Sequence, residues 1–197
     1  MKKKILILGS FGHIGNALCN YLSSKNYQII ATYNKFIDKK KFHLLKKQNI
    51  KFIQCDLKNK SKLKKIFANH KIHTCICSAA VSHDSVAKIF PDKAIDVNCT
   101  GIINLIELQN LFKFKLINIS TGSVFQDIKN SKLKISEYTV PSPKSVYSAT
   151  KRLGEILICN NHEVDKKSCN LRVSWVYGPP IILKKFDPQR GPIPYIL

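Results

Sequence analysis

Three glycines that directly follow a short apolar run constrain the fold of this chain more than any other feature. Residues 4–8 are Lys-Ile-Leu-Ile-Leu, and glycines stand at positions 9, 12 and 15. A short apolar run bounded by glycine is typical of a strand that is buried on both faces. Apolar residues then recur at helical spacing between Ile14 and Leu22. A strand, a tight turn and a helix in this order predict a β-α unit whose helix N-terminus can face a phosphate group.

Strand and helix signals alternate along the rest of the chain. Further strands are predicted at residues 27–32, 50–54, 72–78, 115–120 and 170–176. Helices are predicted at 39–48, around Leu63, Ile66 and Phe67, at 92–112 and at 146–160. Strands that alternate with helices form right-handed β-α-β units and a parallel sheet. We therefore predict an α/β protein of the Rossmann type, a doubly wound parallel sheet of about six strands with helices on both faces.

The last part of the sequence departs from this regular pattern. From Gly178 onward the chain has five prolines and then stops at Tyr195-Ile-Leu197. Domains do not usually end in this way. We expect residues 1–178 to form one domain and residues 179–197 to begin a truncated second region.

A high positive charge raises the question of a nucleic-acid partner. The chain has 33 Lys and Arg residues against 12 Asp and Glu residues, a formal net charge of +21. Only three of the basic residues are Arg, whereas proteins that read bases and phosphates favour the bidentate Arg fork. The Lys residues are spread over every predicted helix and loop. We therefore expect no specific nucleic-acid partner, and no membrane partner, because no apolar run approaches the roughly 20 residues of a transmembrane helix.

The seven cysteines are scattered along the chain, and no pair has the spacing of a zinc site. We expect no bound metal and free, buried thiols in a reducing compartment, which places the protein in the cytoplasm. Cys75 and Cys77 fall in the strand predicted at 72–78 and are expected on opposite faces of the sheet.

Tyr147 and Lys151 stand four residues apart in the helix predicted at 146–160, so they share one face. A tyrosine holds its proton to a pKa of about 10. A nearby ammonium group favours the phenolate and lowers this pKa, which makes the tyrosine a usable acid or base. Thr121 follows the strand predicted at 115–120, and its hydroxyl could bond a substrate oxygen. These three side chains predict redox chemistry at a carbinol or carbonyl group, with a nicotinamide alongside.

A nicotinamide dinucleotide would lie over the carboxyl ends of the strands. Small residues that would allow its close approach follow the strand at 72–78, at Ala79 and Ala80. Candidate contacts on the glycine turn are Gly9, Phe11, Gly12, His13, Ile14 and Gly15. About 20 residues after the turn, an acidic residue would bind the ribose of NAD, but this chain has Asn34 and Lys35 there. Neutral and basic residues tolerate a 2′-phosphate, so NADP is favoured over NAD.

Three polar residues near the predicted site have two interpretations each. Asp56, next to Leu57, could accept a hydrogen bond from the adenine amino group or cap a helix N-terminus, and both roles could hold together. His83 either contacts the substrate at the carboxyl edge of the sheet or is an exposed loop histidine. Asn98 is expected to brace neighbouring backbone and not to take part in catalysis.

Seven segments in this order resemble the extended short-chain dehydrogenase/reductase superfamily, in its NAD-dependent epimerase/dehydratase branch. They are the Gly9/Gly12/Gly15 turn, Asp56-Leu57, Ala79-Ala80, Asp96-Val-Asn98 with Gly101, Ser120-Thr121, Tyr147-x-x-x-Lys151 and residues 171–179. The resemblance implies that residues 1–178 bind NAD(P) and that 179–197 begin a substrate-binding region that is largely missing. It also implies that Thr121 holds a substrate oxygen, that Tyr147 moves the proton, and that Lys151 binds the nicotinamide ribose and tunes Tyr147.

Members of this family typically act on nucleotide-activated sugars, by epimerisation, 4,6-dehydration or keto reduction. Dehydratases usually carry an acidic pair after the Thr, where this chain has Gly122 and Ser123, so dehydration is disfavoured and Ser123 becomes a candidate substrate contact like His83. The Arg172-x-x-Trp-x-Tyr-Gly segment is similar to dTDP-4-dehydrorhamnose reductases. Epimerase and keto-sugar reductase therefore both stay open, and the resemblance implies a homodimer built through residues 146–160. The alternative from another class is a regulator that senses NAD(P) without catalysis.

Overall fold

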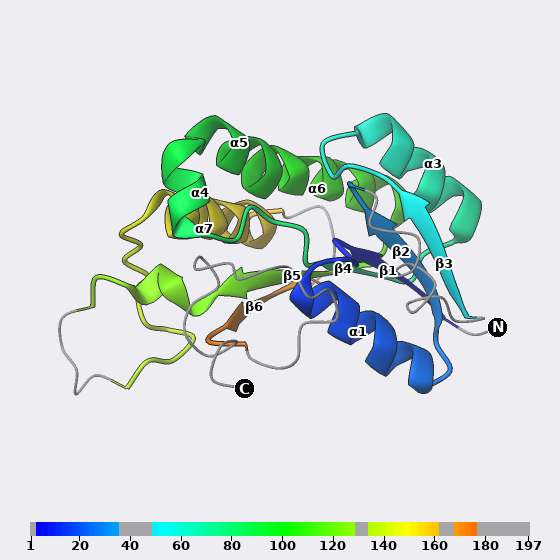
Figure 1. Cartoon of the computed structure of the whole chain (residues 1–197), viewed down its shortest axis with the longest axis horizontal. Coiled ribbons are helices and arrows are strands. Elements are labelled where there is room, and N and C mark those ends of the chain that lie inside the picture. The colour runs from blue at the N-terminus through cyan, green and yellow to red at the C-terminus, as the bar shows by residue number, and fades with distance from the viewer. Residues whose placement is uncertain (1–2, 36–48, 129–133, 162–167, 177–197) are drawn as a thin grey trace.

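Six parallel strands form the centre of the computed structural model, which describes residues 3–35, 49–128, 134–161 and 168–176. The strands are β1 Lys4–Leu8, β2 Gln28–Tyr33, β3 Ile50–Gln54, β4 Thr74–Cys77, β5 Lys115–Thr121 and β6 Cys169–Val173. They lie in the order β3-β2-β1-β4-β5-β6 (Figure 1). This is the order of the doubly wound dinucleotide-binding fold, so the predicted fold class is confirmed.

Helices cover both faces of this sheet (Figure 1). α1 (His13–Ser24) packs on one face, and α3 (Lys60–His70), α6 (Gly101–Phe112) and α7 (Val146–Cys159) lie on the other. Two short helices on that second side, α4 (Asp84–Ile89) and α5 (Pro91–Ile95), precede α6. The chain therefore leaves β1 toward one face and β4 toward the other.

The predicted helix at 92–112 is interrupted by a π-helical turn. α5 leads into η1 (Asp96–Thr100), which leads into α6. Two short elements were not predicted, α4 and the 3-10 turn η2 (Gly122–Phe125), because neither is long enough to show a hydrophobic period. The helix predicted at 39–48 and the region 179–197 lie outside the described residues.

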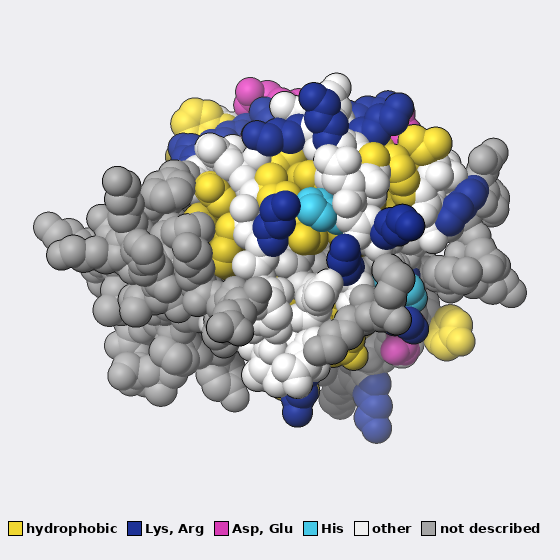
Figure 2. Space-filling model, turned by 90° about the vertical axis from the view of Figure 1, so that its right-hand side faces the viewer, with side chains coloured by type: hydrophobic (Ala, Val, Ile, Leu, Met, Phe, Trp, Pro, Cys, Tyr) yellow, Lys and Arg dark blue, Asp and Glu magenta, His cyan; other side chains and the backbone are white. Residues whose placement is uncertain are grey.

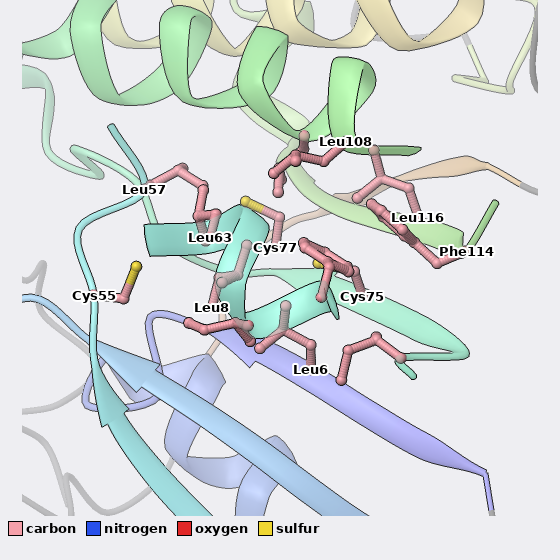
Figure 3. Close-up of a cluster of buried hydrophobic side chains, with 14 of the residues drawn as sticks. Leu6, Leu8, Cys55, Leu57, Leu63, Cys75, Cys77, Leu108, Phe114 and Leu116 are labelled. Carbon is pink, nitrogen blue, oxygen red and sulfur yellow. The ribbon is translucent and has the colours of Figure 1, made fainter. Parts of the chain in front are cut away.

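The larger hydrophobic cluster fills the space between the sheet and α3, α6 and α7 (Figure 3). The predicted apolar face of α3 lies in it, with Leu63, Ile66 and Phe67 at most 4% exposed. Cys75 and Cys77 both belong to this cluster, while Ile76 between them packs on the α1 side. The prediction that the two cysteines face opposite sides is wrong, because residues two apart in a strand share a face.

The cysteines and the charged surface reflect the composition of the chain. All seven cysteines are free thiols, and five of them are buried. On the face in Figure 2, Lys and Arg side chains lie scattered among exposed apolar and uncharged surface, and they prevail over Asp and Glu. None of the described helices combines the length and the apolar character that crossing a lipid bilayer requires.

Candidate functional site

The glycine turn after β1 and the segment after β4 meet at the carboxyl edge of the sheet. β1 and β4 are neighbours whose following helices lie on opposite faces, which is the topological switch point at which folds of this class bind ligands. Gly9 has a φ of +81°, and a Cβ placed on it would lie 2.7 Å from the main-chain nitrogen of Ala79. A Cβ on Gly15 would overlap the carbonyl oxygen of Gly9. Only glycine at positions 9 and 15 allows the turn, α1 and β4 to approach this closely.

Hydrogen bonds anchor the turn on both sides. The Ser10 hydroxyl donates to the carbonyl oxygen of Thr32 at 2.9 Å, and the main-chain N–H groups of Gly9 and Ser10 donate to the same oxygen at 3.1 and 2.8 Å. On the β4 side, the Ser78 hydroxyl donates to the carbonyl oxygen of Leu8 at 2.7 Å. The turn is therefore held between β2 and β4, which keeps its backbone in one conformation.

The start of α1 suits a negatively charged ligand. Among the described residues, no side chain caps its first turn and that turn holds no acidic residue. Gly12 and His13 are exposed, whereas Ile14 packs against the cluster under α1. The first N–H groups of a helix lack intrahelical partners and carry partial positive charge. With the close glycine approach, this start fits the pyrophosphate of a dinucleotide such as NAD(P).

Aromatic rings cover the end of β2 next to the turn. Phe11 stacks on Tyr33 with ring centroids 4.5 Å apart, and its centroid lies 5.7 Å from that of Phe52 on β3. Asn34 and Lys35 follow β2 and are both exposed. The structure thus presents these two side chains at the edge where the fold places the ribose of a dinucleotide.

Asp56 and Leu57 lie after β3 and differ in what they can contribute. The Asp56 carboxylate accepts from the N–H of Lys58 at 2.8 Å, while the N-cap of α3 is Asn59, which accepts from the N–H of Lys62 at 2.9 Å. The helix-cap interpretation of Asp56 is therefore wrong, because α3 begins further along the chain. Leu57 is 5% exposed and belongs to the core cluster under α6. Only its main chain can face a cofactor.

α7 brings the predicted Tyr and Lys to the carboxyl edge. Ser145 and Ser148 form a capping box that sets the start of α7 and places Tyr147 in its first turn. The Thr121 hydroxyl, at the end of β5, lies close enough to Tyr147 to lower the pKa of its hydroxyl. Lys151 lies one turn further along and is 4% exposed. The structure therefore brings Thr121 and Tyr147 together and buries Lys151 on the same helix.

The pKa values of this pair are governed by burial. Burial raises the pKa of Tyr147, the hydrogen bond with Thr121 lowers it, and the Asp84 carboxylate raises it. Burial lowers the pKa of Lys151, while Cys77 and Glu155 raise it. Burial and the Asp84 carboxylate therefore oppose ionisation of Tyr147, and Thr121 favours it. Tuning of the Tyr147 pKa by Lys151 stays a prediction.

A polar network around the first turn of α7 was not predicted from the sequence. The Ser145 hydroxyl donates to Asp84 at 2.6 Å, and the Gln126 amide donates to the other oxygen of Asp84 at 3.4 Å. The Ser148 hydroxyl donates to the Gln126 amide oxygen at 2.9 Å. These contacts join α4, the end of η2 and α7. The Ser-x-x-Ser spacing, which is similar to a capping box, was the only sequence signal for them.

The remaining predicted residues lie around this edge. His83 is the N-cap residue of α4 and Ser123 lies in η2, both half-buried. As substrate contacts they stay predictions. Asn98 braces the backbone as predicted, because its amide bonds both main-chain groups of Val81, at 2.9 and 3.1 Å. It also donates to the Thr150 hydroxyl at 3.0 Å, which ties this loop to α7.

A separate hollow of about 690 Å³ lies at the opposite, amino edge of the sheet, where α3 and α6 end. Its lining includes Phe67, Phe112 and the side chains of Lys71, Lys113 and Lys115. Because Tyr147 and the glycine turn lie at the carboxyl edge, this hollow is not part of the site. In the part of the chain that the structure describes, no three His, Cys, Asp or Glu side chains are grouped so that they could hold a metal ion.

Comparison with known proteins places the chain in a family. The model of the NAD dependent epimerase/dehydratase family matches residues 5–193. The chain belongs to this family. It is 30% identical over 183 residues to the UDP-glucuronate 4-epimerase of Thermodesulfobacterium geofontis, and this alignment covers 88% of the chain and 56% of that protein. It is 27% identical over 176 residues to the dTDP-4-dehydrorhamnose reductase of Aggregatibacter actinomycetemcomitans, and this alignment covers 89% of the chain and 52% of that protein.

Solved structures of epimerases share the fold of this family member. An epimerase of Methanothermobacter thermautotrophicus matches with a TM-score of 0.85 and 24% identity, over 98% of this chain and 57% of that one. The UDP-glucose 4-epimerase of Thermotoga maritima matches with a TM-score of 0.77 and 23% identity, over 90% and 57%. The chain spans about half the length of the curated relatives that it matches.

Proposed function

We propose that the chain forms the NAD(P)-binding half of an enzyme that epimerises or reduces a nucleotide-activated sugar. The observation that carries this proposal is that Thr121 and Tyr147 lie together at the sheet edge that also holds the glycine turn. The names of the relatives, a UDP-glucuronate 4-epimerase and a dTDP-4-dehydrorhamnose reductase, support the substrate class. In this proposal residues 1–178 bind the cofactor and residues 179–197 begin the substrate-binding region.

The glycine turn and the segments that follow β3 and β4 would hold the dinucleotide. The N–H groups from Phe11 to Gly15 would bind the pyrophosphate, and Ala79 and Ala80 would allow its close approach. Asp56 and the main chain of Leu57 would bind the adenine. A bound nicotinamide would supply reversible hydride exchange with a sugar carbon.

Tyr147 would move the proton in this reaction. Its oxygen takes the proton of the sugar hydroxyl during oxidation and returns a proton to the carbonyl oxygen during reduction. Thr121, which lies beside Tyr147, would donate to the same sugar oxygen. Lys151 would hold the nicotinamide ribose. His83 and Ser123, half-buried at the same edge, would contact the sugar.

We also propose NADP as the preferred cofactor. Asn34 and Lys35 are exposed after β2 and carry no negative charge that would repel a 2′-phosphate.

Free thiols support a cytoplasmic location. Exposed apolar side chains on α6 and α7 support a homodimer, with Ile103, Leu153 and Ile156 each 40–44% exposed. Sedimentation velocity would test the dimer, and a single monomeric species at high concentration would contradict it.

The test of the proposed function combines binding with turnover. The chain is titrated with NADPH and NADH, and then incubated with either cofactor and with UDP-glucose, UDP-glucuronate or a dTDP-4-keto sugar. Epimerisation yields a new stereoisomer without net change of the nicotinamide absorbance, whereas reduction consumes one NADPH for each product. Turnover of one of these sugars would support the whole proposal, whereas cofactor binding without turnover would support its NAD(P)-binding half alone. Failure of a folded chain to bind either cofactor would overturn the proposal.

A further inference from the structure

A carboxylate that the proposed reaction does not use lies directly behind the Tyr147/Lys151 helix. Glu155 is four residues after Lys151 on α7 and is completely buried. Its carboxylate accepts hydrogen bonds from Ser120 on β5 at 2.6 Å, from Arg152 on α7 at 2.9 Å, and from Arg172 on β6 at 3.0 and 2.9 Å. One side chain therefore connects three elements of the fold.

The chemistry of this cluster is unusual for a chain so rich in Lys. Only three of its 33 Lys and Arg residues are Arg, and two of these three bond Glu155. The planar guanidinium group of Arg172 meets both carboxylate oxygens, a fixed geometry that a lysine ammonium cannot reproduce. The surface lysines carry charge but cannot form this two-point contact. The contact between Arg172 and Glu155 therefore fixes a direction as well as pairing two charges.

The contacts of Glu155 lead to the part of the candidate site that contains Thr121, Tyr147 and Lys151. Ser120 immediately precedes Thr121 on β5, and Lys151 lies one helical turn before Glu155. The Arg172 guanidinium carbon also lies 5.0 Å above the ring centroid of Phe125, in the η2 turn that contains Ser123. A shift of Glu155 would therefore move α7, the end of β5 and η2 relative to one another.

We propose that Glu155 is a positioning residue, which holds the helix of Tyr147 and Lys151 in fixed register against β5 and β6. A buried ion pair adds little net stability, because desolvation of the charges opposes their attraction. Its directional hydrogen bonds instead select one arrangement of the elements that it joins. The part of the inference that concerns the reaction rests on the proposed function, whereas the structural part does not.

The experiment compares the full-length chain with its Glu155→Gln and Arg172→Lys variants. Glu155→Gln keeps the shape but removes the charge, and Arg172→Lys keeps the charge but removes the fork. The matched control is Glu107→Gln, which breaks an exposed ion pair with Lys60 on the same side of the sheet. Amide hydrogen exchange is measured without ligand, and NADH binding is titrated at a temperature where all variants are folded.

We expect both variants to exchange about tenfold faster in segments 119–125 and 146–157, and unchanged in β1 and β2, because the opening is local. We expect NADH to bind about tenfold more weakly to both, because the site loses its geometry. The control should match the wild type. Exchange that rises evenly over all six strands, with NADH affinity unchanged, would overturn the proposal, as would wild-type behaviour of Arg172→Lys.

Two further results keep the test decisive. If Glu155→Gln does not fold, Ser120→Ala removes one hydrogen bond and leaves the ion pairs, so a smaller increase of exchange in the same two segments is expected. Its absence would overturn the proposal. If the wild-type chain does not bind NADH, the proposed function fails, while the exchange pattern still decides the role of Glu155.

Discussion

The side chains of Tyr147 and Thr121 lie close together, where the first turn of α7 packs against the end of β5. The capping box at Ser145 sets the start of the helix and so the position of Tyr147. Burial raises the pKa of Tyr147, and the contact with Thr121 opposes this effect. The acid–base property of the tyrosine therefore depends on a contact between distant segments.

Replacing Tyr147 by Phe should reduce turnover by about 10²–10⁴-fold, because proton transfer to the sugar oxygen loses its donor. Cofactor affinity should stay nearly unchanged, since the phenol oxygen is not needed to hold the dinucleotide. Steady-state kinetics and a fluorescence titration with NADPH measure the two effects. Tyr21→Phe, at an exposed position of α1, is the matched control. Loss of binding together with turnover would count against Tyr147 as the acid and base.

Asp84→Asn should lower the pKa of Tyr147, because the Asp84 carboxylate raises it. The asparagine oxygen can still accept from Ser145, so the network at the start of α7 should be retained. The pKa is measured by ultraviolet titration, as the difference between each protein and the same protein carrying Tyr147→Phe. An unchanged or higher Tyr147 pKa in Asp84→Asn would show that the Asp84 charge does not act on the tyrosine.

Gly9→Ala should destabilise the chain by about 1–3 kcal/mol, the usual cost of a strained backbone position. Gly9 has a positive φ, and the added Cβ would lie 2.7 Å from the main chain of Ala79. The same change should weaken dinucleotide binding because the turn must move. In Gly122→Ala, the matched control, the nearest atom lies 3.5 Å away. Urea unfolding compares the two, and equal stability would contradict a tight turn at Gly9.

Lys35→Asp should weaken NADPH binding and leave NADH binding unchanged or stronger. An aspartate repels the 2′-phosphate of NADPH and can accept from the ribose hydroxyl of NADH. Lys25→Asp, exposed at the far end of α1, makes the same change of charge away from the site. The ratio of the two dissociation constants is the measurement. A ratio that changes equally in both variants would reflect net charge only.

Glu155 should make the chain sensitive to acid. Burial raises its pKa, but the hydrogen bonds from Arg172, Ser120 and Arg152 outweigh this, and the pKa lies below the ordinary value of 4.5. The folded chain therefore binds this proton less readily than the unfolded chain, so the stabilisation is present above pH 4.5 and is lost as the pH falls through the folded pKa. The difference in unfolding free energy between wild type and Glu155→Gln should narrow on acidification. A difference that stays constant from about pH 7 to about pH 3 would contradict the lowered pKa.

Much of the fold and part of the site could be predicted from local patterns. The run at residues 4–8, the glycine spacing and the helical period after it identify β1, the turn and α1, because each signal lies within a few neighbouring residues. The four-residue spacing of Tyr147 and Lys151 likewise places both on one helix face. The helix-cap interpretation of Asp56 was wrong, because the N-cap of α3 is Asn59. The start of α3 depends on how the chain packs after β3, which the local sequence does not show.

The sequence by itself therefore determined the succession of strands and helices along the chain and the residue types at the carboxyl edge, because short-range spacing encodes both. Only the tertiary structure decided that Thr121 lies beside Tyr147, that Asp84 bonds Ser145, and that Glu155 meets Arg172. Each of these contacts joins residues that lie far apart in the chain. Their partners and their burial depend on how α7 packs on β5 and β6, which no local spacing records.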